Sequence, residues 1–167
     1  YRGAVIIRNL TFVATLSLLL LATPARAAPP TFQAISAIAA STGADITVTL
    51  PAHQANDILL LIGVVRDQND TVTVSGWTQM TGSPFNRSSV SRYWVFWKRA
   101  ASSSETNPVF NKNTPNGDTY AAVINYRGAA TTGDPWEVKG AAATGTADPA
   151  SCTGITTLSA GVIIRLR

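Results

Sequence analysis

Hydrophobic and polar residues alternate along several stretches of the chain after residue 28, as they do in half-buried β-strands. Turn-forming residues separate these stretches, for example at Ser41–Asp45 and Asp67–Asp70. Residues 28–167 contain no convincing amphipathic helical pattern. The alternation predicts strands at Phe32–Ile38, Ile46–Leu50, Thr71–Ser75 and Asp118–Arg127.

Two further segments are apolar on both faces. Ile58–Val65 contains no polar side chain, so a buried helix is the alternative to a strand, but its many β-branched residues and the turn that follows favour the strand. In Arg92–Arg99, Trp94 and Trp97 fall on opposite faces, and each face is apolar. Because such strands must be covered on both sides, we predict that these two are central strands.

The remaining segments are less regular. Ser83–Ser91 is polar and is predicted to be a loop, whereas Pro108–Phe110 is predicted to be a short strand. Residues 128–154 are rich in Ala, Gly, Thr and Asp, which favours long loops with at most a short strand at Trp136–Val138, and a last strand begins at Val162. Around eight short strands joined by turns predict an all-β fold, an antiparallel β-sandwich of the jelly-roll or Ig-like type.

The first 27 residues have the layout of a cleavable secretory signal peptide. A basic start is followed by the apolar run 10–22 and by the small residues Ala25 and Ala27, which suit a signal-peptidase site. A retained membrane anchor is the alternative, but the run has 13 residues, whereas a spanning helix needs about 20. We therefore expect cleavage after Ala27, an extracellular mature protein, and no membrane span in the mature chain.

Residues 28–167 are long enough for a single domain with its own hydrophobic core. Loss of the signal peptide removes three of the 13 basic residues and none of the nine acidic ones, so the net charge falls to +1. A surface this close to neutral gives no long-range attraction for polyanions, and we expect no nucleic-acid partner. Cys152 is the only cysteine, so no intrachain disulfide supports the fold. Because the chain begins at Tyr1 and stops inside the last apolar stretch, we expect residues to be missing at both ends.

The order of five short segments carries a family resemblance. The segments are Asn56–Leu61, Gly76–Thr78, Tyr93–Lys98, Ala121–Gly128 and Asp134–Glu137. In this order they resemble a β-sandwich domain of many uncharacterised bacterial secreted proteins and phage structural proteins, over most of the mature chain. In that family the first segment begins Gly-Asp-Leu-Leu, whereas here Asn56 stands in place of the glycine. The resemblance implies a structural or adhesive role on a cell or virion surface, with no catalytic residues to carry over.

Residues that could perform catalysis are scarce. His53 is the only histidine, so a serine triad would need it between a carboxylate such as Asp57 and a nucleophile, and no Gly-x-Ser-x-Gly motif supplies that serine. Asp134 and Glu137 could be imagined as the acid and base of a glycoside hydrolase, but their spacing around Trp136 is more typical of a turn with an anchoring aromatic residue. We expect a protein without enzymatic activity.

Two kinds of ligand site are candidates. Asp67, Asn69 and Asp70 place several oxygen ligands on one turn, as Ca²⁺ requires, although Asp and Asn also favour such turns for conformational reasons. Exposed tryptophans beside Asn side chains could bind a carbohydrate. The candidates for that site are Trp77, Trp136, Asn111, Asn113 and Asn116.

We therefore predict a secreted structural or adhesive module that binds a surface protein, a glycan or copies of itself. The alternative is a carbohydrate-binding module, in which Trp77 or Trp136 would be exposed. A glycoside hydrolase is a remote third reading, because it needs a cleft with paired carboxylates. No cofactor is expected apart from the Ca²⁺ considered above.

Overall fold

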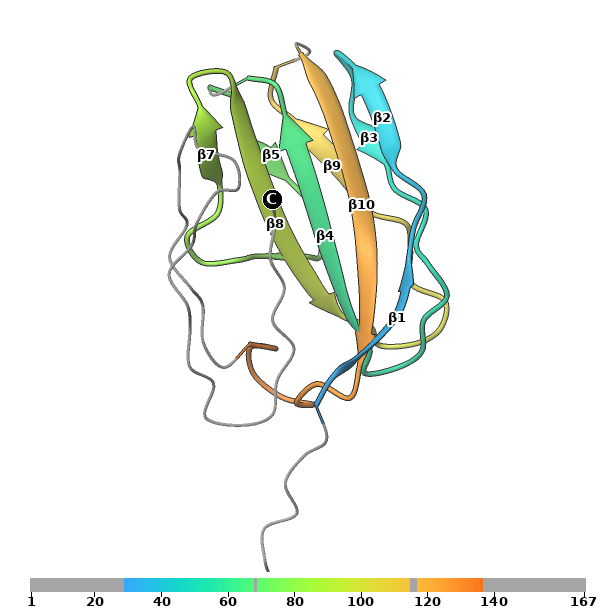
Figure 1. The fold of residues 1–167 in the computed structure, drawn as a ribbon. Helices are drawn as coiled ribbons and strands as arrows, with labels where there is room; N and C mark the ends of the chain where they lie inside the picture. Colours follow the sequence, from blue (N-terminus) through green and yellow to red (C-terminus); the bar gives the residue numbers. More distant parts are fainter. Residues whose placement is uncertain (1–28, 68, 115–116, 137–167) are drawn as a thin grey trace, which may run out of the picture.

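The computed structural model describes residues 29–136 except 68 and 115–116 (Figure 1). All regular structure in this part of the chain is β-strand, and every strand pairing is antiparallel. The predicted signal peptide, the segment after Trp136 and the predicted last strand lie outside the described residues. Within the described residues, no helix is long and apolar enough to cross a membrane.

The strands form a seven-stranded and a three-stranded sheet. The larger sheet has the order β1-β10-β4-β8-β6, with β2 also paired to β10 and β7 to β8, and the smaller sheet has the order β3-β9-β5. The strands are β1 Thr31–Ile35, β2 Ala39–Thr42, β3 Ile46–Thr47, β4 Ile58–Val65, β5 Val72–Thr73, β6 Thr78–Gln79, β7 Phe85–Ser88, β8 Ser91–Arg99, β9 Val109–Lys112 and β10 Asp118–Arg127.

The two predicted central strands are confirmed. β4 lies between β10 and β8 and pairs with both along its length, from Ile58 opposite Tyr126 and Arg99 to Val65 opposite Thr119 and Arg92. β8 in turn lies between β4 and the short edge strands β6 and β7. The middle of the sheet thus consists of the segments whose side chains are apolar on both faces.

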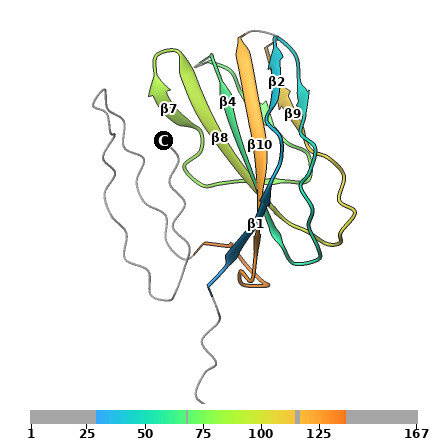
Figure 2. The ribbon, with the colours of Figure 1, turned by 45° about the vertical axis from the view of Figure 1, so that its right-hand side comes forward.

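The hydrophobic core lies between the inner face of the large sheet and the small sheet, which lies behind it in Figure 1 and to one side of it in Figure 2. Phe110 of β9 is fully buried and stacks edge-on against Phe96 of β8, with ring centroids 6.3 Å apart. The Phe110 ring also covers Gly63 of β4, where a Cβ atom would come within 2.3 Å of it. The core therefore depends on the contact of the Phe110 ring with Gly63, which has no side chain to keep the ring away.

Several strand boundaries differ from the sequence prediction, and β2 and β6 are not among the predicted strands. The predicted turn at Ser41–Asp45 begins later, because β2 pairs through Thr42 with β10 and the chain turns at Gly43, whose φ is 80°. β3 ends at Thr47 rather than Leu50, although the Val48 amide still donates to Pro108 O at 3.0 Å. The predicted loop Ser83–Ser91 is wrong over β7, which forms a hairpin with β8. The main chain of β7 pairs with β8 whatever the polarity of its side chains, so the hydrophobic pattern gives no signal there.

Candidate functional site

The outer face of the large sheet carries an exposed apolar patch beside β1. Phe32 pairs with Tyr126 and Ile35 with Ile124, so these side chains lie on the face opposite the core. Tyr120 lies on the same face, opposite Ala40 of β2. Phe32 is 57% exposed, Ile35 56% and Tyr120 49%. We define the outer patch as Phe32, Ile35, Ala40, Tyr120, Ile124 and Tyr126.

One aromatic contact joins two members of the outer patch. The Phe32 and Tyr126 rings meet edge to face, with centroids 6.1 Å apart. Burial raises the pKa of the Tyr126 hydroxyl above its usual value, so this ring is uncharged at neutral pH. The patch contains no Asp, Glu, Lys, Arg or His side chain. The patch is therefore suited to contact with another uncharged, apolar surface.

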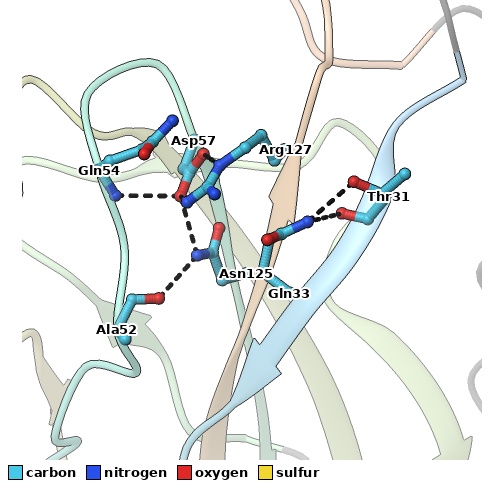
Figure 3. A network of polar contacts seen from close by, with 7 residues as sticks. All are labelled: Thr31, Gln33, Ala52, Gln54, Asp57, Asn125 and Arg127. Atoms are coloured by element: carbon cyan, nitrogen blue, oxygen red, sulfur yellow. Dashed lines mark hydrogen bonds and ion pairs between the residues drawn. The ribbon is translucent and has the colours of Figure 1, made fainter.

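A buried polar network lies where β4 begins and β10 ends (Figure 3). Asp57 is fully buried, and its carboxylate accepts two bonds from Arg127, at 2.8 Å each, and one from Asn125 Nδ2 at 3.0 Å. The Gln54 amide also donates to it at 3.0 Å. Pairing of Ile58 with Tyr126 explains the placement, because the neighbours Asp57 and Arg127 then lie across from each other. These bonds join two strands far apart in sequence.

The pKa of Asp57 is lowered from 3.8 to about 2, mainly by the hydrogen bonds from Arg127. Burial of the carboxylate opposes this shift, whereas the hydrogen bonds from Asn125 and from the Gln54 amide add to it. A carboxylate that holds its proton so weakly does not serve as a general acid at neutral pH. All described contacts of Asp57 are thus those of a structural clamp.

This clamp predicts a specific pH dependence of stability. The unfolded chain binds a proton at Asp57 at a higher pH than the folded chain does, so stability present above pH 4 is lost as the pH falls toward 2. We expect a loss of roughly 2.5 kcal/mol from this group. Urea unfolding at a series of pH values measures it. Glu105 contributes in the same direction, since its pKa is also lowered, mainly by the hydrogen bond from Lys98.

The matched control is Asp57→Asn, which has no carboxylate to titrate. Its free energy of unfolding is expected to fall less steeply between pH 5 and pH 2, by the share that belongs to Asp57. Equal slopes in the two proteins would contradict the assignment.

Asn56, just before Asp57, has a left-handed backbone conformation. Its φ of 69° makes it the only non-glycine residue with positive φ in the described part of the chain. Asn adopts this left-handed conformation more readily than other residues with a side chain. Asn56 is therefore suited to the backbone conformation that brings the chain into β4.

His53 is held by main-chain groups on both ring nitrogens. Nδ1 lies 2.7 Å from Pro51 O, and the Glu105 amide donates to Nε2 at 3.3 Å, which requires the tautomer with the proton on Nδ1. Asp57 is engaged by Arg127 and does not bond to this ring. The hydrogen bond between His53 and Asp57 that a serine triad would need is thus not formed. Of the imagined acid and base, Asp134 is exposed and Glu137 lies outside the described residues.

The predicted calcium ligands are split between the surface and the interior. Asp67 is half-buried and Asn69 is exposed, and Asp67 Oδ1 accepts the Asn69 amide at 2.8 Å, as in an Asx turn. Asp70 is fully buried. The described residues contain no group of three or more His, Cys, Asp or Glu side chains placed to hold a metal ion.

The predicted carbohydrate-binding residues are not gathered on one surface. Trp77 is partly buried and packs against the core, whereas Trp136 is partly buried against Trp97 on the outer face, with ring centroids 5.5 Å apart. Asn111 is exposed. Asn113 is exposed too, and its Oδ1 accepts the Thr71 amide at 2.7 Å. Asn116 lies outside the described residues.

Sequence reasoning did not assign the outer patch or the Asp57 clamp. Alternation in Asp118–Arg127 does show Tyr120, Ile124 and Tyr126 on one face, but not which face packs on the core. The clamp gives no local signal, because its partners are 70 residues apart.

Comparison of the chain with protein-family models, curated proteins and solved structures finds no match.

Proposed function

We propose that residues 28–167 form a secreted structural or adhesive module, without catalytic activity, that associates with copies of itself through the outer patch at a cell or virion surface. The exposed outer patch is the observation that supports this function. Exposed apolar side chains that gather on one face often mark an interaction site, because exposing apolar surface to water is unfavourable. We also propose that the fold is a β-sandwich of the Ig-like or jelly-roll type and that the domain is related to the family that it resembles.

A second copy fits the patch for two reasons. The patch members carry no charge, so the complementary surface must also be uncharged and apolar, and a second copy presents one. Packing about a two-fold axis brings the patch against itself, which is the usual arrangement in dimers. Extension of the sheet through β1 is less suitable, because β1 has five residues and its register shifts between Phe32 and Ala34.

The absence of catalysis in this proposal is supported by how the ionisable residues are used. Both ring nitrogens of His53 face main-chain atoms, and the Asp57 carboxylate accepts four hydrogen bonds. Neither group is placed as a general acid or base would be, and the lowered pKa of Asp57 makes it a poor proton donor at neutral pH.

Sedimentation equilibrium of the purified mature domain tests the self-association. We expect a concentration-dependent dimer for the wild type and at least a tenfold weaker association for Phe32→Ser and Tyr120→Ser, since each removes exposed apolar area from the contact. Val109→Ser is the matched control, because Val109 is 43% exposed on β9 of the other sheet. A wild type that stays monomeric, or a control as defective as the patch variants, would overturn the proposal.

Glycan binding is the second candidate function, and one observation favours it. A shallow surface depression of about 260 Å³ is lined by Arg66, Asp67, Asn69, Ser89 and Val90, most of which can hydrogen-bond sugar hydroxyls. A glycan array with the wild type and with Asp67→Ala separates the two functions. Specific binding that the variant loses, together with a monomeric wild type, would favour the glycan-binding module.

A further inference from the structure

The outer face of the large sheet stays apolar beyond the outer patch, in the direction of β8. Leu60 of β4 lies opposite Ile124 of the outer patch, so its side chain points outward. The same holds for the alternate residues of β4 and for their partners on β8. We define the outer strip as Leu60, Ile62, Val64, Tyr93, Val95 and Trp97. The strip borders the outer patch, shares no residue with it, and contains no Asp, Glu, Lys, Arg or His side chain.

Side chains of the outer strip are shielded from water although they are not in the core. Leu60 is 7% exposed and Val95 is 2% exposed, and neither belongs to the core between the two sheets. The other members of the strip are half-buried. An antiparallel sheet with one face in water carries polar side chains on that face. An apolar outer strip is therefore typical of a sheet that a further segment covers.

The chain that follows β10 leads onto this strip. Arg99, at the end of β8, donates from Nη2 to Gly133 O at 3.0 Å. Trp136 packs edge-on against Trp97 of the strip, with ring centroids 5.5 Å apart. The described chain therefore ends against the outer side of β8, and the segment 137–167 follows it in the sequence.

The sequence of this segment contains an apolar stretch that matches the strip. The period of two gives Val162–Leu166 an aliphatic side, which consists of Val162, Ile164 and Leu166. The opposite side carries Arg165. The outward-facing residues of β4 have the same spacing as the aliphatic side, so the two rows can meet along their length.

We propose that the aliphatic side of Val162–Leu166 packs on the outer strip of the same chain, with Arg165 facing water. Burial of apolar surface on both partners drives this contact. Because the segment is tethered, its effective concentration at the strip is high, whereas a second copy has to associate from solution. The length of the connection 137–161 costs little, since loop-closure entropy grows slowly with loop length. The inference does not rest on the proposed self-association, because the strip and the outer patch share no residue.

Paramagnetic relaxation enhancement in NMR spectra tests this contact in the mature chain. The single cysteine is removed as Cys152→Ser, and a nitroxide is attached to Arg165→Cys, on the polar side of the stretch. We expect the methyl signals of Ile62 and Val64 to lose most of their intensity, because a nitroxide broadens the signals of nearby nuclei. The signals of Val109, on β9 of the other sheet, are expected to keep theirs. Strip signals as intense as those of Val109 would overturn the proposal.

Ile164→Asp places a charge against the strip and is expected to restore most of the intensity of the strip signals. Ile163→Asp is the matched control, because Ile163 lies on the opposite side of the stretch, and it is expected to leave the broadening unchanged. Equal effects of the two substitutions would contradict the proposed packing.

A mixed sample identifies whose segment covers the strip. Isotope-enriched chain without nitroxide is mixed with nitroxide-labelled chain without enrichment, and we expect no broadening of the strip signals. Broadening in this mixture would assign the strip to a second copy and overturn the proposal. All samples carry Phe32→Ser, which removes exposed apolar area from the outer patch. The result is therefore independent of whether the domain self-associates through that patch.

Discussion

Asp57→Ala is expected to lower the free energy of unfolding by about 3–5 kcal/mol at neutral pH, which is a large part of the stability of a domain this size. The substitution removes the acceptor of four hydrogen bonds and leaves the Asn125 amide, which is buried, with only Ala52 O as its acceptor. It also removes the side-chain link between the start of β4 and the end of β10. Urea unfolding monitored by tryptophan fluorescence measures the change.

Asp118→Ala is the matched control. Its carboxylate pairs with Arg66 at 3.5 Å, but the two side chains are 36% and 70% exposed, so the pair is screened by water. We expect a change of at most about 1 kcal/mol for this substitution. If the two variants lost similar amounts of stability, the clamp at Asp57 would be no more important than a surface ion pair, and the interpretation would be wrong.

The middle of the large sheet could be predicted from the sequence because its signal is local. Ile58–Val65 and Arg92–Arg99 are apolar on both faces, and the period of two puts Trp94 and Trp97 on opposite faces. The structure shows that the Trp94 face is the one in the core. The edges could not be predicted equally well. In β7 the polar side chains conceal a strand that its main chain forms with β8.

The candidate sites depended on contacts that sequence patterns do not show. Asp67, Asn69 and Asp70 are adjacent in the turn, which suggested one shared site, but only Asp70 is buried. Its neighbours in space come from the segment around Thr114, 44 residues later. Likewise the outer patch combines β1 and β2 with β10, and the pairing of these strands is a property of the whole sheet.

Phe110→Ala is expected to destabilise the domain by about 3–5 kcal/mol, because it empties the volume of a fully buried ring. Gly63→Ala is expected to cost about 1–3 kcal/mol for the opposite reason, since its Cβ would lie 2.3 Å from Phe110 Cε2 and 2.4 Å from Cζ. In the double variant the new methyl group enters the space that the ring has left. We therefore expect the double variant to lose less stability than the two single losses combined, by about 0.5–3 kcal/mol.

Urea unfolding of the wild type, both single variants and the double variant completes the cycle. Gly76→Ala in the Phe110→Ala background is the control, because no atom lies within 4 Å of a Cβ at Gly76 and its cost comes from a φ of 74°. These two changes are expected to add within about 0.5 kcal/mol. If the losses at Gly63 and Phe110 added as well, the contact between the two sheets would not be made by this ring over this glycine. An interaction energy found for Gly63 and Phe110 but not for the control would place the closest approach of the two sheets at Gly63. This residue is the only glycine of β4, whose other residues are all aliphatic.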